Sequence, residues 1–175
     1  MTGRFCIKHK LIWLILPLVA MSLDLVSKAW ILKAIKPGEQ IAVIKGFFYL
    51  KLSFNQGAIF GIMQEANSWL RAALFIVAGL AALGYFGWEF FRTDTPKAQR
   101  WALGLILGGA LGNGMDRLVR GHVVDFLDFW FGSWEYWIFN LADSFIVCGA
   151  ILYGLVIFFD YRKIKKSQRG LKTQL

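Results

Sequence analysis

Cysteine and histidine are scarce in this chain of 175 residues, which contains only two of each. Cys6 lies in a charged N-terminal tail and Cys148 inside an apolar run, so their positions suit neither a disulfide framework nor a metal site. His9 and His122 are equally isolated. The sequence therefore predicts no metal and no other cofactor. It also lacks a suitably placed base or ligand set for serine, cysteine or metal-dependent hydrolysis.

Charged residues are also few, at 18% of the chain, whereas hydrophobic residues make up 57%. Soluble globular domains usually have about 25% charged and about 45–50% apolar residues. Aromatic residues reach 17%, including eight tryptophans. Tryptophan and tyrosine concentrate at the lipid–water interface, so this composition indicates a membrane protein.

Four apolar segments are each long enough to cross the hydrocarbon core, which takes about 20 helical residues. They are Leu11–Ile31, Trp69–Phe91, Trp101–Val119 and Ile138–Phe159. The sequence thus predicts an all-α integral membrane protein with one domain over residues 1–175. A cleavable signal peptide is the alternative for the first segment. We favour a retained helix, because residues 25–35 remain largely apolar and extend the segment to full membrane length.

The net charge of +9 comes from basic residues that flank the apolar segments. If the four spans alternate, twelve of the twenty Lys and Arg residues fall on one side. The positive-inside tendency then places both termini in the cytoplasm and residues 33–68 and 120–137 outside. We interpret these basic residues as signals for membrane orientation and as ligands for anionic lipid headgroups. The chain has no nucleic-acid-binding motif, so we do not expect it to bind nucleic acid.

The outer loops show patterns of their own. Ile41–Leu52 alternates β-branched and aromatic residues around Gly46, which predicts a hairpin or small sheet. Residues 55–57 have turn chemistry, and residues 58–67 are predicted to form a short interfacial helix. Residues 126–137 are rich in Phe and Trp and are expected at the membrane surface.

Carboxylates near membrane spans are costly, so each is a functional hypothesis. Asp125 follows the third span, and Asp143 is expected about five residues into the fourth, which predicts similar depths on antiparallel helices. Two neighbouring carboxyl groups in a low dielectric tend to share one proton, as in an aspartic protease. The structural alternative is that they cap helices or pair with arginine.

Five motifs, taken in order, resemble those of the signal peptidase II (lipoprotein signal peptidase) family. Residues 109–117 (GALGNGMDR) resemble G-x-x-G-N-x-x-D-R, 123–126 resemble V-V-D-F, and 139–144 (FNLADS) resemble F-N-x-A-D-[ST]. Residues 55–60 (NQGAIF) resemble N-x-G-A-x-F, and 24–28 (DLVSK) resemble D-x-x-[ST]-K. Each motif alone is weak, but the ordered set spans nearly the whole chain.

The resemblance implies that Asp125 and Asp143 are the catalytic carboxyl groups. Supporting or substrate-binding roles are implied for Asp24, Lys28, Asn55, Gly57, Asn113, Asp116, Arg117, Asn140 and Ala142. The i, i+4 spacing also suggests that Asp24 and Lys28 meet on one helix face. Arg117, the neighbour of Asp116 in the sequence, suggests a structural or substrate-orienting charge pair. Glycines near the end of the third span, including Gly108 and Gly112, allow close approach of either another helix or a substrate backbone.

The implied activity is removal of the signal peptide from a prolipoprotein, just before a cysteine that carries a diacylglyceryl group. The resemblance also implies a location in the bacterial inner membrane and inhibition by globomycin-type cyclic peptides. We expect the protein to be a monomer whose partners are lipidated prolipoprotein signal peptides and membrane lipids. Two alternatives remain: a small proton-coupled transporter and a non-catalytic membrane scaffold. Intramembrane charges mark transport pathways too, although the chain lacks an evident inverted repeat.

Overall fold

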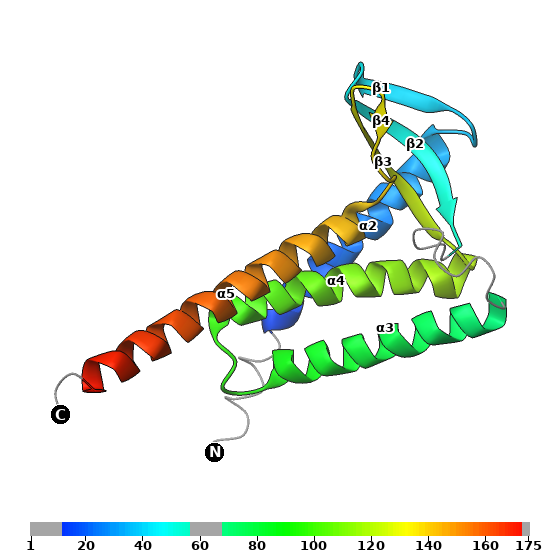
Figure 1. Cartoon of the computed structure of the whole chain (residues 1–175). Coiled ribbons are helices and arrows are strands. Elements are labelled where there is room, and N and C mark those ends of the chain that lie inside the picture. Colours follow the sequence, from blue (N-terminus) through cyan, green and yellow to red (C-terminus); the bar gives the residue numbers. More distant parts are fainter. Residues whose placement is uncertain (1–11, 57–67, 173–175) are drawn as a thin grey trace.

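The computed structural model describes residues 12–56 and 68–172. It is mostly helical with a small antiparallel sheet, as the sequence predicts. Figure 1 shows the long helices running side by side, with the sheet at one end of the bundle. In chain order the elements are η1 (Ile12–Leu14), α2 (Ile15–Ala34), β1 (Gln40–Ile44), β2 (Phe48–Asn55), α3 (Ser68–Phe91), α4 (Lys97–Arg120), β3 (Val123–Phe131), β4 (Trp134–Glu135) and α5 (Leu141–Lys172).

Each long helix covers one predicted apolar segment, but the boundaries differ. The helix α5 begins at Leu141 rather than at Ile138 and continues to Lys172. By length and hydropathy, two helices within the described ranges could cross a membrane: Ile12–Ala34 and Leu141–Lys166. Val77–Phe91 forms a shorter apolar helix. The hydropathy of α4 is lower, because this helix has basic residues in its first and last turns in addition to the buried Asn113 and Asp116.

The predicted hairpin is confirmed by the antiparallel strands β1 and β2, where Ile41 pairs with Leu50. Gly46 in the connecting turn has a φ of 78°, a left-handed conformation that glycine adopts without strain. The strand β2 also pairs with β3, and β3 pairs with β4, which gives the order β1-β2-β3-β4. The strands β3 and β4, within residues 123–135, were not predicted from the sequence. The short helix predicted for 58–67 lies outside the described residues.

An apolar cluster joins the end of α2 to the sheet. Ile31 and Ile35 from α2 and its C-cap pack with Leu52 of β2 and with Val124 and Phe126 of β3. Removing apolar surface from water lowers the free energy of the folded state by roughly 25 cal/mol per Å², so this buried cluster stabilises the junction between α2 and the sheet. This cluster therefore holds the start of β3 against the C-terminal end of α2.

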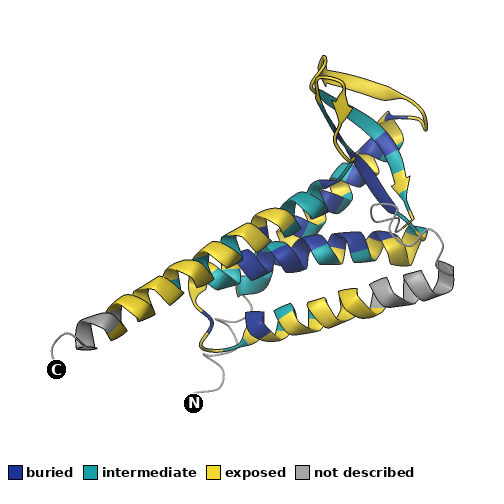
Figure 2. Cartoon of the chain, viewed as in Figure 1, coloured by how far each residue is buried: buried dark blue, intermediate teal, exposed yellow. Residues whose placement is uncertain are grey.

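The helix α4 lies at the centre of the bundle and is the most continuously buried of the helices (Figure 2). Gly104, Gly108 and Gly112 repeat every four residues and so form one ridge that faces α2. A Cβ atom built on Gly108 would lie 2.6 Å from the Cβ of Ala20 and 2.7 Å from the backbone oxygen of Pro17. These three glycines therefore allow α2 and α4 to pack closely against each other.

Replacing Gly108 by leucine should therefore force α2 and α4 apart. We expect a clear fall in the thermal unfolding midpoint of the detergent-purified protein, by an amount corresponding to about 1–3 kcal/mol of overpacking. Gly114 of the same helix is a matched control, because nothing lies within 4 Å of a Cβ built there. Gly114→Ala should leave the midpoint unchanged or raise it slightly, since alanine favours helix. Equal midpoints for Gly108→Leu and the parent would contradict this packing.

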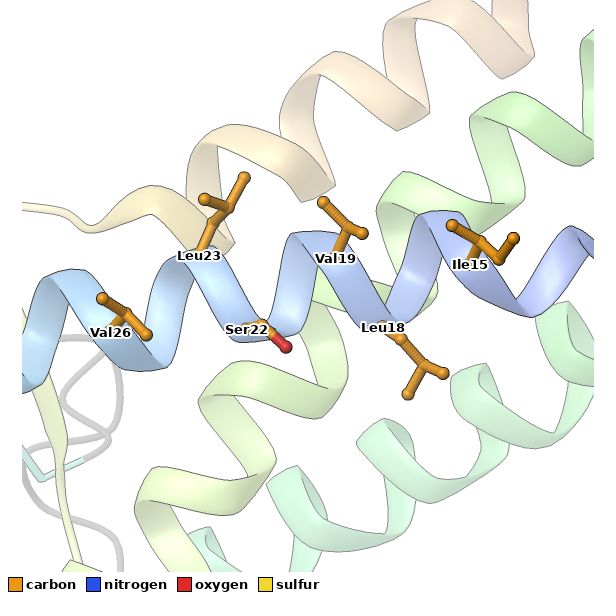
Figure 3. Close-up of a pocket in the computed structure, with 6 residues that line it drawn as sticks. All are labelled: Ile15, Leu18, Val19, Ser22, Leu23 and Val26. Atoms are coloured by element: carbon orange, nitrogen blue, oxygen red, sulfur yellow. The ribbon is translucent and has the colours of Figure 1, made fainter.

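The two faces of α2 have different surroundings. Its buried face carries Pro17, Ala20, Asp24 and Lys28 toward the other helices and Ile31 toward the sheet. The opposite face bears an open apolar groove of about 390 Å³, shown in Figure 3, whose lining residues are Ile15, Leu18, Val19, Ser22, Leu23 and Val26. This groove has no titratable side chain, so it offers no groups for acid–base chemistry. An apolar face of this kind suits contact with lipid.

Candidate active site

The candidate site lies at the end of the bundle where α4 turns into the sheet. Gly121 ends α4 in a left-handed conformation with a φ of 76°, and the chain then enters β3. The backbone N–H of Val124 donates a hydrogen bond to Asp116 Oδ2 at 3.1 Å, which ties the start of β3 to the last turns of α4. Asp125 follows on β3 opposite Ser53 of β2, and it is 3% exposed.

Asp143 lies in the first turn of α5. The side-chain oxygen of Asn140 accepts a hydrogen bond from the Asp143 N–H at 3.0 Å, and Asp143 Oδ2 accepts one from the Asn140 N–H at 3.2 Å. This reciprocal pair is a capping box, with Asn140 in the N-cap position. Asp143 is therefore one turn or less into the helix, so the expected depth of five residues is wrong. The positive end of the helix dipole favours a carboxylate at this position.

Side-chain amides connect the two carboxyl groups. Asn140 Nδ2 donates to Asp125 Oδ1 at 2.6 Å and also to Asn113 Oδ1 at 3.1 Å. Asn113 Nδ2 donates to Asp143 Oδ1 at 2.7 Å, and Asn55 Nδ2 donates to Asp125 Oδ2 at 3.0 Å. Because amides donate hydrogen bonds without carrying charge, they position both carboxyl groups and add no formal charge beside them.

The environment changes the acidity of Asp125. Burial is the largest effect and raises its pKa, and the negative charge of Asp143 raises it further. The hydrogen bonds from Asn55 and Asn140 and the charge of Lys28 act in the opposite direction. The net result is a pKa of about 6 instead of 3.8. Asp125 can therefore hold a proton at mildly acidic pH, as one member of an acid–base pair must.

A second group of charges lies directly behind these amides. Lys28 Nζ is 2.7 Å from Asp24 Oδ2, 3.0 Å from Asp116 Oδ2 and 2.8 Å from Asn113 Oδ1. Asp24, Lys28 and Asp116 are fully buried, and Asp116 also pairs with Arg120. Two buried carboxylates thus face two cations, which compensates the cost of burying each charge.

The comparisons with known proteins agree with this arrangement. The family model described as signal peptidase (SPase) II matches residues 16–159. The chain belongs to the signal peptidase II family. It is 41% identical over 162 residues to the lipoprotein signal peptidase of Xylella fastidiosa (strain M12), covering 91% of this chain and 95% of the relative. It is 42% identical over 156 residues to that of Burkholderia ambifaria (strain MC40-6), covering 89% and 91%.

Two solved structures, each described as a bacterial membrane enzyme, share the fold. One superposes with a TM-score of 0.71 at 29% identity and covers 83% of this chain and 91% of the other. The second gives a TM-score of 0.69 at 30% identity. The resemblance seen in the motifs is confirmed, and as a signal peptidase II family member the chain is a membrane enzyme of the aspartic peptidase class.

The structure brings most of the sequence-predicted site residues of this signal peptidase II chain into one cluster. They are Asp24, Lys28, Asn55, Asn113, Asp116, Asp125, Asn140, Ala142 and Asp143, which are joined by the contacts above and by a 2.9 Å hydrogen bond from the Ala142 N–H to Asp24 Oδ1. Gly57 lies outside the described residues. No group of three or more His, Cys, Asp or Glu residues suited to a metal ion is found within 12–56 and 68–172.

The expected pair between Asp116 and Arg117 is wrong. Consecutive residues on a helix point in different directions, so Arg117 turns away and donates to the backbone oxygen of Asn113 at 3.3 Å. Arg120, one turn further along α4, pairs with Asp116 instead. Arg120 was not among the predicted site residues, although its i, i+4 spacing from Asp116 indicates such a pair.

Proposed function

We propose that Asp125 and Asp143 are the two catalytic carboxyl groups with which this signal peptidase II family member removes the signal peptide from prolipoproteins. One observation carries the assignment: both carboxyl groups are held by a shared set of asparagine amides, and Asp125 has a pKa of about 6. Asp24 and Asp116 instead form ion pairs with Lys28, so we assign them a supporting rather than a catalytic role. The relatives named above are lipoprotein signal peptidases, which supplies the substrate class.

The chemistry follows from a pair that holds one proton. The ionised carboxylate accepts a proton from a water molecule, and the resulting hydroxide attacks the scissile carbonyl carbon. The protonated carboxyl group donates its proton to the carbonyl oxygen, which stabilises the tetrahedral intermediate. The proton taken from water then passes to the leaving nitrogen as the C–N bond breaks. Collapse of the intermediate returns a proton from its hydroxyl group to the pair, which regains its starting state.

The position of the pair suits a substrate that is anchored in lipid. Asp125 is on β3 and Asp143 is in the first turn of α5. Figure 1 shows β3 and the start of α5 at one end of the bundle, beside the sheet. A signal peptide whose apolar segment lies in the bilayer would present its scissile bond at this depth. From the motif resemblance we also propose that cleavage occurs just before a cysteine that bears a diacylglyceryl group and that globomycin-type cyclic peptides inhibit the enzyme. We further propose that the enzyme is a monomer.

The direct test is a gel-shift assay. Purified protein in detergent is mixed with a diacylglyceryl-modified precursor, and cleavage is read as a faster-migrating band. The same precursor without the lipid is the matched control, and it should be cut slowly or not at all. Ion flux through reconstituted vesicles without any cleavage would support the transporter alternative instead.

The proposed topology has four spans, with both termini in the cytoplasm of the inner membrane and the sheet outside. The α3–α4 connection and the first turn of α4 carry Arg92, Lys97 and Arg100, and the distal part of α5 is also rich in basic residues. Both regions lie at the end of the bundle opposite the sheet (Figure 1). The buried contacts of Asp24 and Lys28 with α4 and α5 support a retained first helix.

Reporter fusions after residues 65, 95, 135 and 170 should give outside, inside, outside and inside signals, because basic flanks remain cytoplasmic. Paired reporters that fluoresce or are active on opposite sides provide the control for expression. A cytoplasmic signal at residue 135 would contradict the topology, since both aspartates would then face the wrong compartment.

A further inference from the structure

Lys28 occupies a position that acid–base chemistry alone does not explain. Its side chain is fully buried, and it reaches from α2 to the middle of the amide cluster. A lysine paired only with Asp24 and Asp116 would neutralise charge. However, its ammonium group also donates to Asn113 Oδ1 at 2.8 Å, and Asn113 contacts Asp143 directly.

The two ends of the Asn113 amide have different partners. Its oxygen accepts from Lys28 and from Asn140 Nδ2, and its NH₂ group donates to Asp143 Oδ1. The oxygen and nitrogen ends are similar in shape, so only the donors and acceptors around them decide the orientation. A flipped amide would bring its NH₂ group against the Lys28 ammonium and its oxygen against the Asp143 carboxylate. Both contacts would be repulsive.

We infer that Lys28 is a positioning residue of the catalytic pair, because it holds the Asn113 amide in the one orientation that supplies Asp143 with a hydrogen-bond donor. The inference rests on the proposed roles of Asp125 and Asp143. Lys28 itself does not touch either carboxyl group through a hydrogen bond among the described contacts. Its effect on Asp143 passes through Asn113, and its charge also acts on Asp125 at longer range.

Lys28→Met removes the ammonium group and keeps a long side chain. We expect kcat for the lipidated precursor to fall about tenfold, the value of one hydrogen bond to a charged group, with little change in KM. Asn113→Leu should cause a similar loss. If Lys28 acts through Asn113, the double variant should be no slower than the slower single variant. Losses that multiply in the double variant would overturn the inference.

A pH profile separates positioning from simple structural support. Removing the positive charge of Lys28 makes ionisation of Asp125 less favourable, so the pKa of Asp125 rises. The limb of the kcat/KM profile that reports loss of the shared proton should therefore move to higher pH in Lys28→Met. A fall in the amount of folded enzyme would lower the whole profile without moving that limb, and this result would also count against the inference.

Asp24→Asn/Lys28→Met is the matched folding control. It removes one negative and one positive charge, so Asp116 remains balanced by Arg120, and an asparagine oxygen can still accept from the Ala142 N–H. We expect a thermal midpoint close to that of the parent and a kcat that stays low. Full recovery of kcat, or unfolding of this variant, would overturn the inference. Cleavage by Asp125→Asn or Asp143→Asn would instead refute the proposed function.

Discussion

Asp125→Asn and Asp143→Asn should each insert and fold normally, yet cleave a diacylglyceryl-modified precursor at least about 10³-fold more slowly than the parent. Each substitution removes one member of a pair that must both accept and donate a proton. An asparagine can do neither at neutral pH, although its size matches the aspartate. The double variant should be little slower than either single variant, because the two residues act as one unit. The measurement is single-turnover cleavage on a gel.

Asp128→Asn provides a matched control on the same strand. Asp128 is also buried, three residues after Asp125, but its Oδ2 accepts from the Trp130 indole N–H at 3.0 Å and takes no part in the amide cluster. This variant should keep near-normal turnover. If Asp128→Asn lost as much activity as Asp125→Asn, or if the losses of the two dyad variants multiplied, the assignment of the pair would be wrong.

The same pair should give a bell-shaped pH profile. The free enzyme works with one shared proton, so kcat/KM should fall above an apparent pKa of about 6, where Asp125 loses that proton. It should fall again at lower pH, where both carboxyl groups become protonated. A bound substrate excludes more water and disfavours the ionised form further, so the corresponding limb of kcat should lie at higher pH.

Local patterns in the sequence were sufficient to predict the long helices and the first hairpin. The apolar segments predicted α2 to α5, and the alternation over Ile41–Leu52 predicted β1 and β2, because these signals depend on neighbours along the chain. The strand β3 has no such signal. Its residues 123–131 are nearly all apolar or aromatic apart from Asp125 and Asp128, and they become a strand through pairing with β2.

In the candidate site, too, the sequence predicts which residues take part, whereas the fold determines which residues meet. Motif resemblance selected Asp125, Asp143 and the asparagines, but it could not show which partner each side chain meets. The contact between Lys28 and Asp116 exists only because the glycine ridge lets α2 approach α4 closely. Likewise, the start of α5 at Leu141 is set by the cap that Asn140 makes with Asp143, which places Asp143 nearer the helix end than hydropathy suggested.

Asn140 has two functions. Its side-chain oxygen caps α5, and its NH₂ group donates to Asp125 and Asn113. The two functions can be separated by substitution. Asn140→Ser keeps an oxygen that can cap the helix, because serine and asparagine are similarly good N-caps, but it loses the NH₂ group. We expect the parent's thermal midpoint and a kcat about 100-fold lower, since Asp125 loses its 2.6 Å hydrogen bond and its fixed position. Asn140→Ala should show the same loss of kcat together with a lower midpoint, because the lost cap costs about 1 kcal/mol. Near-normal turnover in Asn140→Ser would show that the amide serves only to cap the helix, and that Asp125 is positioned without it.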